Sequence, residues 1–236
     1  RRSPELAGVF IWRTMRAAVV IDYQNMMRTG AQLFHPEAKK HEKVLDPFRF
    51  ANTLIQVRNS KQKPGMEHAT LQRIFVYRGM PNASYQPTPN AYAMAQVAQW
   101  SKNFMVNVET RPLKYRHRFD DEGCKVRDPS GRFVFESIQE KGIDVMCALA
   151  MVREARKFDI EVVILASHDT DLVPALDEAA QLGQAKIETV SWYDTAQRER
   201  CSQLRAGRPM WNTLLNRSEY ELCLDPVDYL AVVEGR

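Results

Sequence analysis

An uninterrupted apolar run, Ala17-Ala18-Val19-Val20-Ile21, stops abruptly at Asp22. A strand that is apolar on both faces is typical of the middle of a parallel sheet, where helices cover both faces. A second run of this kind, Val163-Ile164-Leu165-Ala166, is followed closely by Asp169 and Asp171. The two runs predict buried central strands whose carboxyl ends carry acidic residues.

Extended and helical patterns alternate along most of the chain outside these two runs. Further strands are predicted at residues 71–77, 104–110 and 187–192, and helices at 48–57, 91–102, 143–152 and 172–182. This alternation is typical of βαβ units with right-handed crossovers. We therefore expect an α/β protein, a three-layer α/β/α domain with a central, mainly parallel sheet of about five strands.

The pattern divides the chain into three parts. Residues 1–14 read poorly as structure and Met15 resembles a natural start, so we expect this segment to derive from an upstream reading frame or an expression vector. Residues 15–194 are predicted to form the domain, with a basic insertion at 111–135 where the alternation is lost. Residues 195–236 are less regular, and we expect a C-terminal extension that packs on the domain.

The composition is that of an ordinary globular protein. The 236 residues are 44% hydrophobic and 26% charged, with a formal net charge of +4. So small a charge is compatible with a polyanionic partner without requiring one. The 4 cysteines are far apart and form no CxxC pair, which favours free thiols over a zinc site. No apolar run approaches the length of a bilayer span, so a cytoplasmic protein with no membrane partner is expected.

Acidic residues stand at both central strand ends and at one helix start. Asp22 ends the first run, Asp169 and Asp171 follow the second, and Asp144 opens the helix at 143–152. In open parallel sheets, ligands bind beyond the carboxyl ends of the strands. Carboxylates gathered there repel one another unless they share a cation, and Mg²⁺ or Mn²⁺ is the usual solution. The pattern favours a metal centre formed by these acids and suited to phosphate chemistry.

Each acid also has a simpler structural explanation. Asp169 or Asp171 can cap the helix that follows, and Asp22 can cap a short helix after the first strand. Asp144 can be a favourable charge at a helix N-terminus. Asn25 can orient the first acid or a bound water through its amide, although an asparagine there is more often a turn residue. The gathering of the acids at one edge of the sheet is what favours a metal site over separate caps.

Three motifs occur in order along the chain. They are Asp22-Tyr23-Gln24-Asn25, Glu140-Lys141-Gly142-Ile143-Asp144 and Ser167-His168-Asp169-Thr170-Asp171-Leu172-Val173-Pro174. In that order and spacing they resemble the motifs of the NYN domain family, the LabA-like branch of the PIN-like nucleases, over residues 16–192. The resemblance implies a PIN-like, Rossmannoid fold and a metal-dependent ribonuclease activity. It also implies an acidic cluster of Asp22, Asp144, Asp169 and Asp171, with Asn25 as a polar companion in the catalytic set.

Two positions depart from the family's pattern. His168 stands where the family usually carries a small residue, and Tyr23-Gln24 replaces a commoner small-residue turn. A histidine beside a metal can act as acid or base, although a side chain that points elsewhere is the more frequent case. Ser167, His168 and Thr170 are therefore kept as candidates without an assigned role.

The insertion at 111–135 has the composition of a nucleic-acid contact loop. Arginine and lysine alternate there with aromatic residues, which suits phosphate contacts and stacking on unpaired bases. The alternative is a solvated hairpin whose cations pair with its own acids. Because the insertion follows the third strand, we expect it on the same edge of the sheet as the acids. The predicted substrate-binding residues are Arg111, Lys114, Arg116, Arg118 and Lys141.

These features together predict a metal-dependent endoribonuclease that hydrolyses RNA phosphodiester bonds with Mg²⁺ or Mn²⁺. A non-cleaving RNA-binding module of the same fold is one alternative, but such a protein gains nothing from four carboxylates facing a polyanion. An Mn²⁺-dependent nucleotide-sugar transferase is another, and it explains only Asp169 and Asp171. The sequence leaves open whether the RNA is single-stranded or structured. It also leaves open the oligomeric state, a homo-oligomer included.

Overall fold

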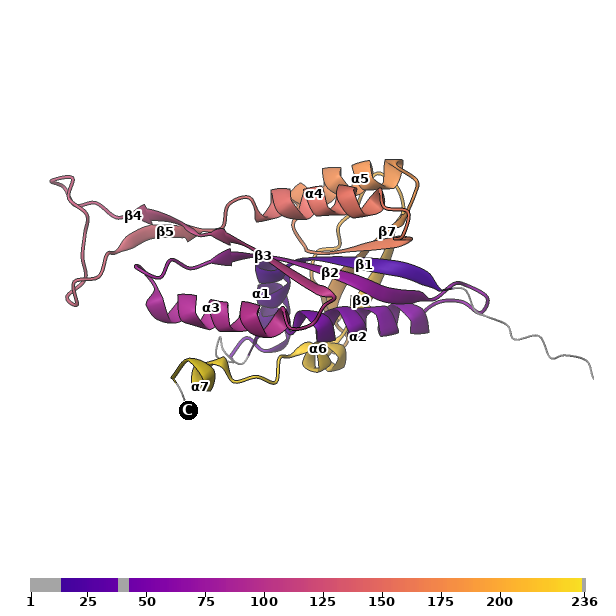
Figure 1. Ribbon diagram of the computed structural model, residues 1–236, viewed down its shortest axis with the longest axis horizontal. Helices are drawn as coiled ribbons and strands as arrows, with labels where there is room; N and C mark the ends of the chain where they lie inside the picture. Colours follow the sequence, from indigo (N-terminus) through magenta and orange to yellow (C-terminus); the bar gives the residue numbers. More distant parts are fainter. Residues whose placement is uncertain (1–13, 38–42, 235–236) are drawn as a thin grey trace, which may run out of the picture.

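Six parallel strands form the central sheet, in the order β3-β2-β1-β6-β7-β9 (Figure 1). They belong to a computed structural model that describes residues 14–37 and 43–234. A short strand, β8 (Glu199–Arg200), pairs antiparallel with β7. The parallel strands are β1 (Met15–Asp22), β2 (Ala69–Met80), β3 (Val106–Pro112), β6 (Val162–Ala166), β7 (Lys186–Asp194) and β9 (Trp211–Leu215).

Helices cover both faces of this sheet, as Figure 1 shows. One face carries α1 (Tyr23–Phe34), α2 (Pro47–Ser60), α3 (Pro87–Trp100), α6 (Arg217–Cys223) and α7 (Tyr229–Glu234). The other carries α4 (Ile143–Ala155) and α5 (Val173–Gln181). Alternate residues of β1 enter two separate hydrophobic clusters, Val19 on the α1 side and Val20 on the α4 side. The predicted three-layer α/β/α class is therefore confirmed, with a mainly parallel sheet.

Strand β2 is longer than predicted at both of its ends. Gly79 and Met80, which lie beyond the predicted end of the strand at residue 77, continue it and pair with Arg111 and Pro112 of β3. Arg111 therefore belongs to the sheet rather than to the insertion. The expected segment 1–14 has residues 1–13 outside the described part of the chain.

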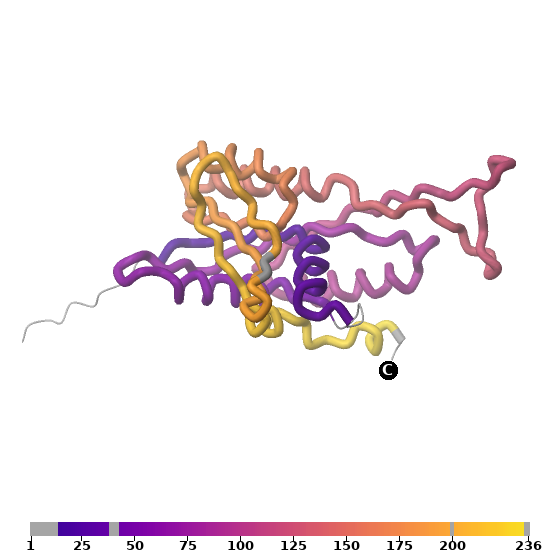
Figure 2. Tube along the Cα trace, turned by 180° about the vertical axis from the view of Figure 1, so that it is seen from behind, coloured from indigo at the N-terminus to yellow at the C-terminus, as the bar shows by residue number. Residues whose placement is uncertain are grey.

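The C-terminal tail completes the sheet and one of its covering layers. Strand β9 adds to the sheet by pairing with β7, and Asn216 caps α6 in a capping box with Glu219. Tyr220 packs its buried ring against Phe34 and Trp192. Seen from behind, the tail passes from the α5 layer to the α6 layer across the sheet edge (Figure 2). The hydrophobic core therefore contains residues from both ends of the described chain.

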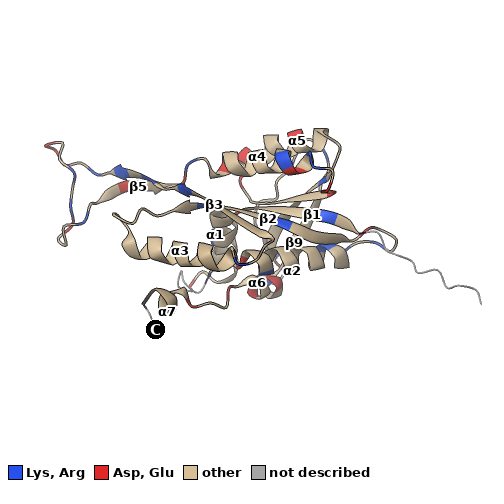
Figure 3. Cartoon of the chain, viewed as in Figure 1, with Lys and Arg blue, Asp and Glu red and all other residues tan. Residues whose placement is uncertain are grey.

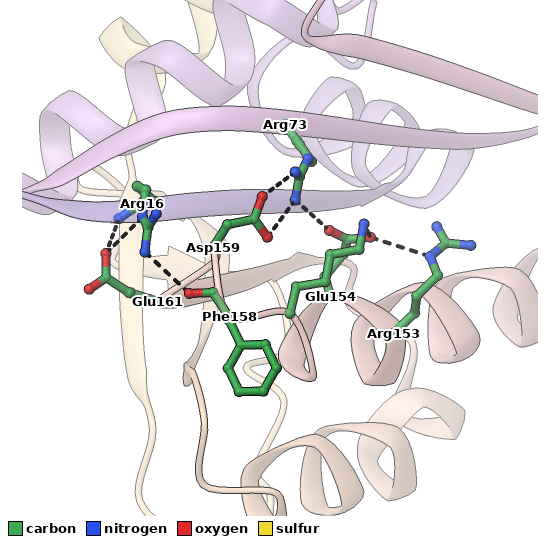
Figure 4. A network of polar contacts seen from close by, with 8 residues as sticks. Arg16, Arg73, Arg153, Glu154, Phe158, Asp159 and Glu161 are labelled. Atoms are coloured by element: carbon green, nitrogen blue, oxygen red, sulfur yellow. Dashed lines mark hydrogen bonds and ion pairs between the residues drawn. The ribbon is translucent and has the colours of Figure 1, made fainter.

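An ionic network holds the C-terminal end of α4 against the sheet (Figure 4). The Glu154 side chain is 0% exposed and accepts hydrogen bonds from Arg73, Arg153 and Lys157. Arg73, on β2, also pairs with Asp159. A buried carboxylate needs such partners, because an unpaired charge in the interior is costly. The network fixes the direction of α4 and hence the position of its N-terminal end, where Asp144 lies.

A two-stranded antiparallel ribbon projects from the domain, and both views show it extending away from the helices (Figures 1 and 2). It is built from β4 (Lys114–His117) and β5 (Phe135–Gln139), and we call residues 113–139 the arm. The arm leaves at the carboxyl end of β3 and returns directly to the motif that opens α4. In the part of the chain that is described, no helix has the length and apolar character of a membrane span.

Candidate active site

The register of β1 and β6 brings the first and third motifs together. Ile21 and Ala166 are paired neighbours in these adjacent parallel strands. The residues that follow them, Asp22 and Ser167, therefore lie side by side at the carboxyl edge of the sheet. The Ser167 hydroxyl donates a hydrogen bond to Oδ2 of Asp22 at 3.0 Å.

A cavity of about 240 Å³ opens at this edge, and we call it the carboxylate cavity. Acidic residues from three parts of the chain line it: Asp22 from the end of β1, Glu140 and Asp144 from the β5–α4 connection and the first turn of α4, and Asp169 from the loop after β6. Its remaining lining residues are Asn25, Arg28, Thr29 and Ile143. The fold thus brings together carboxylates that are far apart in the sequence.

Asp22 is the most buried of these acids, with 5% of its surface exposed. Burial raises the pKa of Asp22 to about 6, against an ordinary value of 3.8. The hydrogen bonds from Ser167 and from the backbone N–H of Asn25 act in the opposite direction, and the negative charges of Glu140 and Asp144 raise the pKa further. A cation in the cavity would relieve both the burial penalty and the repulsion.

Asn25 and Ser167 fix the loop that carries Asp169. The side-chain oxygen of Asn25 accepts a hydrogen bond from the His168 backbone N–H at 2.8 Å. The Ser167 hydroxyl accepts one from the Asp169 N–H at 3.1 Å. Asn25 contacts Asp22 through its backbone N–H, at 3.3 Å, and not through its amide. Both polar side chains therefore position the acids of the cavity.

The capping explanation of the acids also holds in the structure. Asp22 is the N-cap of α1, and Asp169 caps the 3-10 helix η2 (Thr170–Leu172) by accepting a hydrogen bond from the Asp171 N–H at 3.0 Å. A carboxylate has two oxygens and several lone pairs, so capping leaves room for a second partner. Capping and a place in the cavity are therefore compatible for both residues.

Asp171 does not line the carboxylate cavity. It lies in η2 with an exposed side chain, next to the exposed Thr170. The structure therefore brings Asp22, Asp144 and Asp169 together and leaves the fourth predicted acid outside. The tight turn of η2 explains this placement, because Asp171 donates its N–H back to Asp169 within the turn.

His168 is buried and faces the tail. Its Nδ1 lies 2.8 Å from the carbonyl oxygen of Ser202, so Nδ1 carries the proton and donates it. Burial lowers the pKa of His168, while the bond to Ser202 opposes that shift. His168 is not one of the described residues that line the carboxylate cavity. The ring therefore connects the loop that follows β6 to the C-terminal tail.

Glu140 is a site residue that the sequence prediction did not assign. Its carboxylate accepts a hydrogen bond from the Gly79 N–H at the end of β2. Burial raises the pKa of Glu140, and the Gly79 hydrogen bond and the nearby Arg28 lower it. A Cβ atom at Gly79 would lie 2.4 Å from Oε1 of Glu140, so only glycine allows this approach. The signal in the sequence was weak: an acid four residues before Asp144, within the quoted motif.

The residue types that line the cavity suit a hard divalent cation. Their arrangement is less suitable. Carboxylate oxygens are the ligands that Mg²⁺ and Mn²⁺ prefer. Among residues 14–37 and 43–234, however, no group of three or more His, Cys, Asp or Glu side chains is arranged to hold a metal ion. Mg²⁺ often keeps several of its waters and takes one or two carboxylates directly, which is compatible with acids spread around a cavity.

The arm separates its cations from most of its aromatic rings. Lys114 and Arg116 are exposed at alternate positions of β4, which share one face of the strand, and Arg118 is exposed just beyond its end. Figure 3 shows the basic residues along the arm. Arg116 has one weak ionic contact, to Glu136 at 3.8 Å. The cations thus form a row that remains accessible to a polyanion.

The aromatic residues of the arm pack mainly against one another. Tyr85, from the loop before α3, contacts Tyr115 and Phe135 with ring centroids 5.0 and 5.1 Å apart. His117 and Phe133 are 5.0 Å apart. Stacking on unpaired bases by these rings, as the sequence suggested, would compete with this packing. Phe119 is 56% exposed and is the better placed ring for such a contact.

Two of the predicted substrate-binding residues, Arg111 and Lys141, lie where the arm joins the domain. Arg111 places its guanidinium next to Gly142, where a Cβ atom would be 3.5 Å from Nη2. Lys141 is exposed between Glu140 and Gly142. Both cations therefore stand at the start of α4, close to two of the cavity acids.

Comparisons with known proteins add little to this picture. No protein-family model matches the chain, and no curated protein matches it. A search of solved structures finds the crystal structure of a protein of unknown function from Vibrio parahaemolyticus. It is 14% identical, with a TM-score of 0.43, and the match covers 90% of this chain and 97% of that one. Fold and cavity together define an α/β protein with an acidic site at the carboxyl edge of its sheet.

Proposed function

We propose that this chain is a metal-dependent endoribonuclease that hydrolyses RNA phosphodiester bonds, related to the NYN family. The observation that carries the proposal is the carboxylate cavity, in which Asp22, Glu140, Asp144 and Asp169 share one space. Mutual repulsion of these acids is a standing cost unless a cation or a proton joins them. The carboxyl edge of a parallel sheet is also where open α/β folds bind their ligands.

Asp22, Asp144 and Asp169 are the residues that would hold Mg²⁺ or Mn²⁺. Such a cation, when bound, neutralises the charge that develops on the phosphate. Ser167 and Asn25 keep Asp22 and the loop of Asp169 in place. Glu140, whose pKa is raised by burial, is suited to accept a proton from an attacking water.

Cations around the cavity are suited to hold the RNA backbone. Arg28 lines the cavity, and Arg111 and Lys141 stand beside the start of α4. The row Lys114, Arg116 and Arg118 on the arm continues this basic surface away from the domain. Phosphate contacts by such side chains position a nucleic acid without reading its sequence.

A non-cleaving RNA-binding protein is the second candidate, and one observation favours it. The described acids do not converge as a set of three around a single point that could hold an ion. A binder of this kind would retain RNA on the arm and leave it intact whatever metal is present.

Asp169→Asn separates these possibilities and is our first prediction. Asparagine caps a helix about as well as aspartate, so the fold should survive. With labelled single-stranded and structured RNA in Mg²⁺ or Mn²⁺, we expect wild-type cleavage, none in EDTA, and a roughly 100-fold loss in the variant. Asp171→Asn should lose clearly less activity, because Asp171 lies outside the cavity.

The matched control is Glu178→Gln, which removes one negative charge from an exposed position on α5. It should cleave like the wild type. Intact RNA with the wild-type protein in every metal, together with retained RNA binding, would establish the non-cleaving alternative. Full activity of Asp169→Asn would remove Asp169 from the site.

A further inference from the structure

A second and larger cavity, of about 580 Å³, adjoins the carboxylate cavity. We call it the α1–tail cavity, because its walls are α1 and the tail segment that follows β7. Asn25 and Thr29 line both cavities. A group bound in one cavity is therefore a direct neighbour of a group bound in the other.

The described lining of the α1–tail cavity is polar but carries no formal charge apart from what His168 can acquire. The amides of Gln32 and Gln197 and the residue Ser202 contribute its hydrogen-bonding groups, and Leu33 and Pro36 contribute apolar surface. An amide offers a donor and an acceptor side by side, which is the pattern that recognises the edge of a nucleobase. Such a lining suits a neutral, flat, hydrogen-bonding ligand better than a phosphate or a metal ion.

In this wall, Nε2 of His168 is a hydrogen-bond acceptor that no donor in the described part of the chain reaches. Because its Nδ1 donates to the Ser202 carbonyl, Nε2 keeps a lone pair. That Nε2 is buried and has no hydrogen-bond partner among the described residues. A buried polar atom left unpaired is costly. A ligand that brings an N–H group into the cavity, with a small adjustment of the ring, would remove the cost.

We propose that the α1–tail cavity binds a nucleobase, that of the nucleotide next to the phosphate held at the carboxylate cavity. The volume lies within the range of roughly 300–1,000 Å³ typical of small-molecule sites. The link to a neighbouring phosphate rests on the proposed function, whereas the binding of a base does not. The amides of Gln32 and Gln197 contact the base edge and give the protein its preference among nucleotides.

Neutral nucleosides test the cavity without involving metal, phosphate or arm. Binding of adenosine, cytidine, guanosine and uridine is measured by ligand-observed NMR on the full chain, with ribose as the sugar control. We expect at least one nucleoside to bind more tightly than ribose. In the double variant Gln32→Ala and Gln197→Ala that affinity should fall roughly threefold to tenfold. Gln181→Ala, the same change at an exposed position of α5, should bind like the wild type.

Nucleosides that bind no better than ribose would overturn the proposal, and so would equal binding by the double variant. A cleavage assay on the same preparations keeps the two proposals apart. Base binding without cleavage in any metal would leave the cavity assigned and reject the nuclease. Cleavage without nucleoside binding would retain the nuclease and reject the cavity.

Discussion

Asp22 caps a helix and lines a cavity with the same side chain. It accepts a hydrogen bond from the Asn25 N–H as the cap of α1, and another from the Ser167 hydroxyl. It also lines the carboxylate cavity beside Glu140 and Asp144. The protein therefore keeps a buried carboxylate whose negative charge destabilises the fold in the absence of a cation.

Asp22→Asn should stabilise the metal-free protein, in a pH-dependent way. The folded pKa of about 6 lies above the ordinary 3.8, so the folded state holds the proton more tightly than the unfolded chain. Wild-type stability consequently falls as the pH rises from about 4 to about 6, and stays lower above that. In EDTA at pH 8, the variant should have a free energy of unfolding higher by about 1–3 kcal/mol. Chemical denaturation measures it.

The gain should shrink as the pH is lowered toward 4, because wild-type Asp22 is then protonated in the folded state. Added Mg²⁺ should raise the stability of the wild type and leave Asp22→Asn unchanged, since only binding to the folded state stabilises. Glu178→Gln, which keeps Asp22, should match the wild type in its stability at pH 8 and in its stabilisation by Mg²⁺. A variant no more stable than the wild type at pH 8 would mean that the burial of Asp22 carries no penalty.

The residues that could be predicted from the sequence are those placed by local rules. Asp22 and Asp169 follow apolar strands that are neighbours in the sheet, and Asp144 opens the helix that packs on them. Glu140 could not be predicted, because its place depends on Gly79, which is 61 residues away in sequence. Asp171 lies outside because η2 is a tight turn, a detail that an Asp-x-Asp pattern does not reveal.

The arm packs largely independently of the hydrophobic core of the domain. The arm's packing is its own aromatic cluster with Tyr85, and its cations remain exposed on alternate positions. The sequence indicated an insertion that leaves the strand–helix alternation, and the structure forms it as the antiparallel ribbon of β4 and β5. The sequence does not show which aromatic rings of the arm are buried against other rings, because one member of the cluster, Tyr85, comes from a separate loop.

Replacing Arg116 and Arg118 together by alanine should weaken RNA binding and flatten its salt dependence. For a single strand, each lost phosphate contact lowers the slope of log K against log salt by about 0.7. Titration of a fluorescent RNA at several salt concentrations measures the slope. The matched control is Arg205→Ala with Arg208→Ala, which removes the same charge from exposed positions of the tail.

The control pair should leave the slope close to that of the wild type. If the two pairs of substitutions flatten the slope equally, the arm contributes only net charge. If neither changes it, the arm is a solvated hairpin and the basic surface used by RNA lies elsewhere.

In the whole molecule, the tail and the domain share one core. Tyr220 of α6 is 0% exposed and packs on Phe34 of α1 and Trp192 of β7. The sequence indicated an extension that packs on the domain, but not that β9 would extend the sheet beside β7. Strand pairing across such a distance depends on complementarity of whole surfaces, which no local pattern records.

Tyr220 offers a matched pair of substitutions that tests this shared core. Tyr220→Ala should lower the free energy of unfolding by about 3–5 kcal/mol, because it removes a large buried ring. Tyr220→Phe should be neutral or stabilising, since the hydroxyl is buried with no hydrogen-bond partner among the described residues. Denaturant unfolding followed by circular dichroism measures both. A mild effect of the alanine would mean that the tail packs only loosely.

The attachment of the arm has a consequence for how such a protein can evolve. Its two ends are held close together, by the Leu113 N–H bond to the Met80 carbonyl and by Glu140 on Gly79. No residue of its tip is among the described residues that line the carboxylate cavity. Mutation and selection can therefore lengthen, recharge or replace the tip while the carboxylate cavity stays intact. Related proteins that descend from one ancestor are therefore expected to differ first in the molecules that the arm contacts, and only later in the carboxylate cavity.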